Sequence, residues 1–236
     1  MQRYFVSGTV KDLVFSEQDA FHIQKVMRLS RGDEIEVVLD SKVYLAVIDS
    51  SSPLKVHIQE EKKEDSELSS HVRLFFPLCK SDKSELVIQK ATELGVGSIY
   101  FYRAKRSVVK LDNADFNKKL SRYLAIAKEA SEQCHRQIIP EIKGVYDIKD
   151  IKNELCDLNL LAYELEAGQT NKLEELLNNS RGSISLIVGP EGGFDVKEVE
   201  ELVKMGFHKI SLGKRILRVE TAAIYGLSVI AFNLEK

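Results

Sequence analysis

The sequence has no tryptophan, only three cysteines and only four prolines among 236 residues. Cys79, Cys134 and Cys156 are odd in number, far apart and without a CxxC pair, so no disulfide framework is expected. The five histidines show no metal-ligand spacing such as HExxH, which argues against a zinc site. These absences favour a reducing compartment and exclude the small disulfide-bonded and zinc-dependent classes of protein.

Long apolar runs are also missing. The most apolar stretch, residues 222–232, is 11 residues long and contains Gly226 and Ser228, whereas a membrane span needs about 20 apolar residues. We therefore expect this stretch to be a buried helix. Residues 1–5 lack the apolar run of a signal peptide. The sequence thus predicts a cytoplasmic protein without a membrane partner.

A strong net charge is absent too, because 34 Lys and Arg residues face 36 Asp and Glu residues. The net charge of −2 argues against a uniformly basic nucleic-acid binder. The charge is unevenly distributed, however. Residues 73–143 carry 14 basic and 8 acidic side chains, while residues 1–72 and 144–236 are both acidic. A local basic face, formed by the middle segment, is therefore predicted.

Hydrophobic residues make up 44% of the chain, enough to bury a core. A charged, polar run at residues 60–70 predicts a boundary between domains over 1–70 and 71–236. The first domain shows short β-like patterns and one helical pattern, which together predict a small β-barrel. The predicted strands are 4–6, 34–39, 43–48 and 55–59, and the predicted helix is 20–29.

Strands and helices alternate after residue 71, which predicts an α/β fold with a mostly parallel sheet and helices on both faces. The predicted strands are 72–77, 98–102, 158–163, 184–188 and 209–212. The predicted helices are 83–94, 115–134, 173–177, 196–205 and 221–232.

A glycine-rich turn, LIVGPEGGFD at residues 186–195, joins a buried strand to a helix. Its position after a parallel strand is where α/β sheets bind ligands. Asp195 and Glu198 have the spacing of a helix-capping box. The turn is neither a P-loop nor a GxGxxG motif, and an ordinary tight turn is an equally good interpretation.

Three further segments contain side chains that could bind a ligand or RNA. LGKRILRVETA, at residues 212–222, places Ile216 and Leu217 within a basic loop, and such large apolar side chains need a partner that buries them. The loop at 102–110 holds four basic side chains behind aromatic residues, a combination that binds phosphates and unpaired bases. For the polar helix end at 128–137, a solvated face is the default interpretation.

Together these segments resemble one family. The stretches that carry the resemblance are LIVGPEGGFD, LGKRILRVETAA, QKATELGV, RSVVK and EASEQCHRQIIPEI, with MQRYFV and HIQKVMRLSRGDEI near the N-terminus. They are similar to the RsmE family, SPOUT-superfamily methyltransferases that methylate uridine N3 in 16S ribosomal RNA. The resemblance covers nearly the whole chain, and the GPEGG and RILRVETA pair at this separation is highly specific.

The resemblance implies a PUA-like β-barrel that binds RNA, a SPOUT domain with a deep trefoil knot, a homodimer, and S-adenosyl-L-methionine as cofactor. We expect no metal, because the histidines lack metal-ligand spacing. Carried over by position, the cofactor-binding residues are Tyr163, Leu165, Gly189, Glu191, Gly192, Gly193, Leu212, Gly213, Ile216 and Leu217. The RNA-binding residues are Arg3, Arg28, Arg103, Lys105, Arg106, Arg136 and Arg215.

Uracil N3 carries a proton at neutral pH, so an enzyme must remove or compensate that proton before methyl transfer. An arginine near O2 or O4 would stabilise the developing charge; we assign this role first to Arg218 and second to Arg136. Glu191 and Glu220 are candidate proton acceptors, although Glu220 serves equally well as an acidic side chain at a helix N-terminus. The target base must be unpaired or extruded, within an assembled 30S subunit.

Two other functions stay open at this point. The protein could be a SPOUT enzyme that methylates transfer RNA or a ribose 2′-OH. It could also be a non-catalytic, RNA-binding ribosome assembly factor, but the intact GPEGG and RILRVETA motifs disfavour the eroded cofactor loops that such a factor would have.

Overall fold

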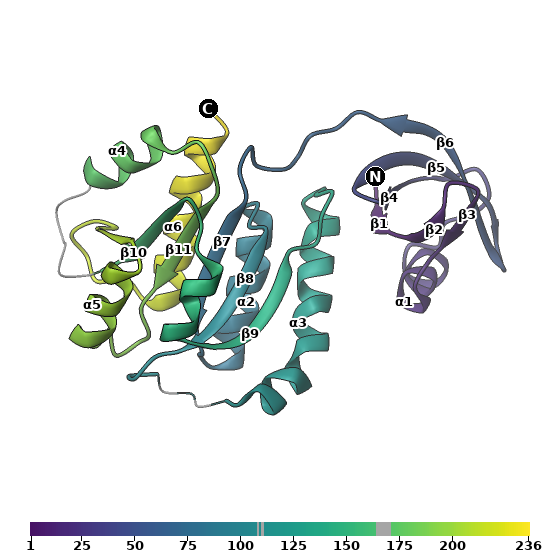
Figure 1. Ribbon diagram of the computed structural model, residues 1–236. Helices are drawn as coiled ribbons and strands as arrows, with labels where there is room; N and C mark the ends of the chain where they lie inside the picture. The colour runs from purple at the N-terminus through teal and green to yellow at the C-terminus, as the bar shows by residue number, and fades with distance from the viewer. Residues whose placement is uncertain (108, 110, 164–170) are drawn as a thin grey trace. The chain divides into compact units, whose positions relative to one another are not determined.

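The computed structural model describes residues 1–107, 109, 111–163 and 171–236, which divide into two compact units (Figure 1). Unit 1 comprises Met1–Glu67 and Ser131–Ile138, and unit 2 comprises Leu68–Ala130 and Ile139–Lys236. The division at Glu67 lies inside the polar run at 60–70. The return of Ser131–Ile138 to unit 1 was not predicted, because the contacts that hold this segment are distant in sequence.

Unit 1 contains a four-stranded sheet in the order β1-β4-β5-β6, a separate hairpin and one short helix. β1 runs parallel to β4, and the other pairs are antiparallel. The bounds are β1 (Arg3–Phe5), β4 (Glu34–Leu39), β5 (Lys42–Ser51), β6 (Leu54–Lys62), β2 (Ser7–Thr9), β3 (Asp12–Val14) and α1 (Glu17–Phe21).

The helix predicted over 20–29 was misplaced. α1 begins after Ser16, whose hydroxyl accepts a hydrogen bond from the Asp19 backbone N–H, as an N-cap does. A π-helical turn, His22–Val26, then ends the helical segment. The β2–β3 hairpin was not predicted either, because its short strands are largely exposed and lack an alternating apolar pattern.

A buried ionic cluster lies beside the apolar core of unit 1. Arg3 and Glu36 are both buried, and Arg3 donates to Glu36 Oε2 from Nε at 3.0 Å and from Nη2 at 2.9 Å. Lys62 Nζ donates to Glu36 Oε1 at 2.5 Å, and Glu64 pairs with both Arg3 and Lys62. Burial alone would raise the pKa of Glu36, but the hydrogen bonds from Lys62 and Arg3 lower it to about 2.

The same cluster holds the segment Ser131–Ile138. Arg3 Nη1 donates to the His135 carbonyl at 2.6 Å, and His135 itself has a positive φ of 58°. Glu67 accepts hydrogen bonds from the backbone N–H of Gln137 at 2.8 Å and from Arg136 Nη2 at 2.6 Å. The segment therefore belongs to unit 1 through charge-assisted hydrogen bonds to groups that would otherwise be buried without partners.

Unit 2 contains a six-stranded sheet in the order β12-β10-β11-β7-β8-β9, in which every neighbouring pair is parallel. The predicted parallel sheet is thus confirmed. Its strands are β7 (Val72–Pro77), β8 (Ser98–Arg103), β9 (Glu141–Asp147), β10 (Leu158–Ala162), β11 (Ile184–Val188) and β12 (Phe207–Ile210). β9 was not predicted, since this edge strand contains Gly144 and several polar residues.

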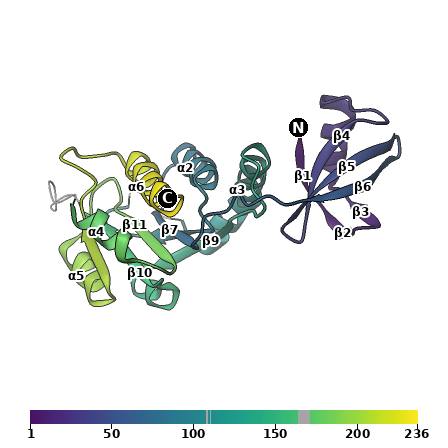
Figure 2. The ribbon, with the colours of Figure 1, turned by 90° about the horizontal axis from the view of Figure 1, so that it is seen from above.

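Helices cover both faces of this sheet, as the alternation predicts (Figure 2). Alternate side chains of β7 show the two faces: Leu74 and Phe76 pack with one set of helices, and Phe75 packs with the other. The first face carries α2 (Ser81–Glu93), α3 (Asn113–Gln133), α4 (Asn171–Asn179) and α6 (Val219–Leu234). The second carries α5 (Val196–Lys204) and the 3₁₀ turn Ile148–Glu154.

The most apolar stretch of the sequence forms most of α6, which packs closely on the sheet. A Cβ atom at Gly226 would lie 2.7 Å from the Leu186 side chain of β11, so glycine permits this close approach. Among the residues that the structure describes, no helix has both the length and the apolar character needed to cross a bilayer.

Candidate functional site

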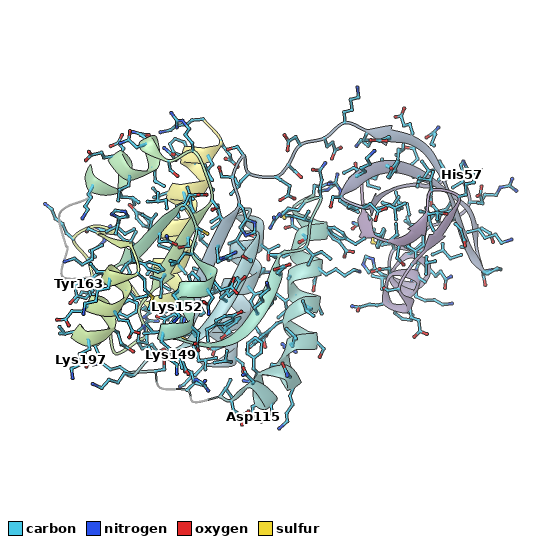
Figure 3. The ribbon with its side chains drawn as sticks, viewed as in Figure 1. His57, Asp115, Lys149, Lys152, Tyr163 and Lys197 are labelled. Atoms are coloured by element: carbon cyan, nitrogen blue, oxygen red, sulfur yellow. The ribbon has the colours of Figure 1, made fainter. Side chains whose placement is uncertain are left out.

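A cavity of about 560 Å³ lies in unit 2, beside the carboxyl ends of β10, β11 and β12. Its walls come from residues that directly follow these three strands: Tyr163 (labelled in Figure 3), residues 189–193 and residues 211–218. Because β10 lies between β11 and β12, the three connections converge at one edge of the sheet. The volume falls within the ~300–1,000 Å³ typical of small-molecule sites.

The loop after β11 brings its backbone close to the cavity. Gly193 has a φ of 68°, and a Cβ atom at Gly192 would lie 2.9 Å from the Arg106 Cβ and 3.2 Å from its carbonyl oxygen. α5 then begins at Asp195, whose capping box with Glu198 is formed as predicted. The glycines therefore allow the loop that lines the cavity to turn tightly and to pack its backbone against Arg106.

The loop after β12 forms a second wall. Gly213 turns the chain with a φ of 110°, and Ser211 Oγ lies 3.2 Å from its backbone N–H. Ile216 is 89% exposed and Leu217 is half-buried. The structure thus gives Ile216 no apolar partner among the described residues, and it leaves the side chain available to a bound molecule.

Arg218 is the N-cap residue of α6, and its side chain is exposed at the cavity. Its carbonyl oxygen accepts the Ala222 backbone N–H at 2.8 Å, so the backbone is fixed by the helix. Within the described parts of the chain, its guanidinium has no hydrogen-bond or ion-pair partner. The backbone of Arg218 is therefore fixed by α6, while its cationic side chain can bind a ligand in the cavity.

Lys83 also lines the cavity, although sequence reasoning did not single it out. Its Nζ donates a hydrogen bond to Glu191 Oε1, and it lies 3.5 Å from Glu220 Oε2. The hydrogen bond to Glu191 raises the pKa of Lys83, so the side chain stays protonated at neutral pH. The signal that could have identified it is its place just after β7, which neighbours β11 in the sheet.

The structure brings most of the predicted site residues together. Leu165 lies outside the described residues, and Glu220 contacts the site through Lys83 rather than by lining the cavity. The predicted residues that line it are Tyr163, Gly189, Glu191, Gly192, Gly193, Leu212, Gly213, Arg215, Ile216, Leu217 and Arg218. Those that sequence reasoning missed are Lys83, Ala162, Pro190, Ser211, Lys214, Val219 and Ala222.

The basic loop after β8 lies next to the glycine-rich loop. Arg106 Nη1 lies 3.3 Å from the Gly192 carbonyl, and Lys105 Nζ lies 3.0 Å from Asp195 Oδ2. Both basic side chains are exposed, whereas Arg103 is half-buried and pairs with Asp147 at 2.9 Å. Exposed cations therefore stand beside the cavity, and Arg28 is exposed in unit 1.

Two of the predicted RNA-binding arginines need correction. Arg3 and Arg136 are each only 2% exposed, and their guanidinium groups are paired with Glu36 and Glu67 respectively. A guanidinium buried in this way cannot reach a phosphate, nor can that of Arg136 reach a substrate base, without breaking its ion pair. In this structure both arginines hold unit 1 together.

The close approach at Gly192 gives a testable prediction. Gly192→Ala should lower the affinity of the cavity for its ligand about tenfold, because the new Cβ atom must displace Arg106 and with it the loop. Adding Arg106→Gly removes the 2.9 Å contact and should restore part of the affinity. Calorimetric titration with S-adenosyl-L-methionine would measure both effects. If Gly192→Ala left the affinity unchanged, the loop would be shown to accommodate a Cβ atom at this position without displacing Arg106.

Within the described part of the chain, no group of three or more His, Cys, Asp or Glu side chains is placed to hold a metal ion. The cavity instead offers glycine backbone groups, apolar side chains and a few charged groups.

Comparison with known families agrees with this arrangement. Residues 66–231 match the model of an RNA methyltransferase domain, and residues 15–61 match an RNA methyltransferase PUA domain. The protein therefore has the α/β SPOUT methyltransferase fold with an N-terminal PUA domain.

Among curated proteins, the ribosomal RNA small subunit methyltransferase E of Bacillus subtilis is 36% identical over 251 residues, covering 100% of this chain and 98% of its own. That of Mesomycoplasma hyopneumoniae is 32% identical and covers 97% of this chain and 98% of its own. The chain belongs to the ribosomal RNA small subunit methyltransferase E (RsmE) family.

Solved structures give the same result for the fold. A structure described as a methyltransferase of Legionella pneumophila in complex with the cofactor S-adenosylmethionine has a TM-score of 0.87 and 30% identity, covering 98% of this chain and 96% of its own. The Neisseria gonorrhoeae ribosomal RNA small subunit methyltransferase E, bound to S-adenosyl methionine, has a TM-score of 0.83 and 26% identity. The match covers 98% of this chain and 96% of that chain.

Proposed function

We propose that this protein transfers a methyl group from S-adenosyl-L-methionine to N3 of a uridine in 16S ribosomal RNA, within the assembled small subunit. The observation that carries the proposal is the cavity whose walls are the GPEGG and RILR segments, with the Arg218 side chain exposed at its edge. Family membership and the cofactor named for two similar structures support the cofactor and the RNA class.

The residues of the cavity suit this cofactor. Ala162, Leu212, Ile216 and Leu217 offer apolar contact to an adenine ring, and the loop backbones offer hydrogen-bonding groups to its edge. Lys83 and Glu191 give the cavity a charged, polar region beside these apolar side chains. When bound, the cofactor supplies an electrophilic methyl group.

The side chains around the cavity account for the remaining chemistry. The exposed guanidinium of Arg218 binds a base oxygen and stabilises negative charge as N3 loses its proton. Glu191, which faces the cavity, is the candidate proton acceptor. Fixing the base and the methyl donor in line lowers the barrier by up to about 7–11 kcal/mol.

Binding of RNA is assigned to exposed basic side chains. Lys105, Arg106 and Arg215 lie in unit 2 at or beside the cavity, and Arg28 is exposed in unit 1. Neutralising phosphates releases counterions, so RNA affinity should fall as salt is raised. We place the protein in the cytoplasm, where small subunits are assembled.

We also propose the homodimer and the deep trefoil knot of the family. The dimer is supported by two large apolar side chains of α6 that are partly exposed, because Tyr225 is 47% and Phe232 is 64% exposed. Covering these side chains in a symmetric interface would remove them from water. The knot would be formed by the chain around the loops that line the cavity.

Methylation of assembled 30S subunits and of naked 16S rRNA tests the proposed function. The enzyme should transfer radiolabelled methyl groups to subunits lacking the modification, and nucleoside mass spectrometry should identify N3-methyluridine. A ribose-methylated product, or transfer to transfer RNA alone, would instead identify a different RNA methyltransferase. Binding of the cofactor without any transfer would favour an assembly factor.

A further inference from the structure

Three charged side chains from three different elements meet beside the cavity, and two of them, Lys83 and Glu191, line it. Lys83 comes from α2, Glu191 from the loop after β11, and Glu220 from the first turn of α6. The Lys83 ammonium contacts Glu191 Oε1 and lies 3.5 Å from Glu220 Oε2. We call these three residues the Lys83 cluster.

The Lys83 cluster carries a formal charge of −1, since two carboxylates face one ammonium. The Glu220 side chain is 14% exposed, and its buried Oε2 atom accepts no hydrogen bond from the described residues. Lys83 stays protonated because its hydrogen bond to Glu191 raises its pKa. The neighbouring Cys79 thiol adds no charge, because burial raises its pKa to about 12.

The other charged groups of the cavity are all cationic and solvated. Lys214, Arg215 and Arg218 lie on the loop after β12, and all three side chains are exposed. Water and salt screen exposed charges more strongly than the partly buried charges of the Lys83 cluster. The cluster therefore contributes a local negative potential to a cavity whose rim is basic.

Methyl transfer changes the charge of the cofactor but hardly its shape. The donor carries a cationic sulfonium, and the product, S-adenosylhomocysteine, carries a neutral thioether in its place. A net negative cluster stabilises the first and does little for the second.

We propose that the Lys83 cluster makes the cavity select the sulfonium donor over the thioether product, with Lys83 setting the size of the negative charge. This inference rests on the proposed function, because it requires the cavity to bind S-adenosyl-L-methionine. Weak retention of the product would allow the spent cofactor to leave after each transfer.

Calorimetric titration of the full-length protein with donor and product, without RNA, tests this inference independently of turnover. Glu220→Gln is nearly isosteric and brings the cluster to a charge of zero. It should weaken donor binding about tenfold and leave product binding within about twofold. Lys83→Met brings the charge of the cluster to −2. It should therefore raise the ratio of donor affinity to product affinity, whereas Glu220→Gln lowers it.

The pair Lys90 and Glu93 provides the matched control. It is an ion pair of 2.8 Å on the same helix, α2, and neither residue lines the cavity. Lys90→Met and Glu93→Gln should leave both affinities unchanged.

Equal weakening of donor and product in Glu220→Gln and Lys83→Met would overturn the inference, because it would make the cluster a purely structural link between three elements. An unchanged affinity ratio would overturn it too. If the unaltered protein bound neither ligand, the proposed function itself would fail, which is a distinguishable result.

Discussion

Replacing Arg218 with alanine should lower the rate of methylation of 30S subunits about 100- to 1,000-fold, the loss typical of removing one group that stabilises transition-state charge. Affinity for S-adenosyl-L-methionine should stay within a few-fold of the original value. The guanidinium is exposed at the cavity and has no partner among the described residues, so its loss leaves the helix N-cap backbone unchanged. Single-turnover transfer assays and calorimetry measure the two effects separately.

Two further variants sharpen the Arg218 experiment. Arg218→Lys keeps the charge but loses the planar, two-point hydrogen bonding, so it should recover only part of the rate. Arg181→Ala removes an exposed arginine of unit 2 that does not line the cavity, and it should have no effect. Near-normal turnover in Arg218→Ala would refute the catalytic assignment of this residue.

Replacing Arg3 with methionine should destabilise unit 1 by about 3 kcal/mol, because it removes two hydrogen bonds to the buried Glu36 carboxylate, which Lys62 alone then neutralises in part. The lost hydrogen bond to the His135 carbonyl should also loosen the segment Ser131–Ile138, which Glu67 still holds. Urea denaturation of the full chain, followed by hydrogen exchange of Ser131–Ile138, would measure both consequences.

Arg122→Met is the control for Arg3→Met. Arg122 also makes two hydrogen bonds to one carboxylate, that of Glu85, but it is 69% exposed, so its removal should change stability little. If Arg3→Met instead left stability intact and weakened RNA binding, Arg3 would be an RNA contact, as the family resemblance first implied.

The order of strands and helices in unit 2 could be predicted because each buried strand is a short apolar run between turn signals. Residues 184–188, for example, were predicted as a strand and form β11. β9 escaped prediction because only tertiary packing makes Glu141–Asp147 a strand: its Ile142 and Val145 join the core, while Gly144 accommodates the ring of Phe116. Sequence pattern identifies core strands better than edge strands.

The sequence predicted those residues of the candidate site that lie in a recognisable loop motif. It did not predict site residues that come from other parts of the chain. The GPEGG and RILR segments were identified because glycines and an apolar pair in a basic loop are unusual. Lys83 was missed because a lysine at the start of a helix carries no local signal of the two carboxylates, 108 residues away in the case of Glu191, that it meets.

Arg3 and Arg136 were misassigned for a related reason. The sequence shows that arginines are present but does not show whether Glu36 and Glu67 neutralise and bury them. The charge of a residue is a local property, whereas its accessibility depends on contacts between distant parts of the chain.

The return of Ser131–Ile138 to unit 1 means that neither unit is a continuous stretch of chain. A fragment ending near residue 67 would lack the segment that pairs with Glu67, and a fragment starting there would carry a helix end without its binding site. Recombination at a single point in the gene could therefore not exchange one unit for another without loss. The two units can change by point mutation, but neither can be exchanged as an independent domain.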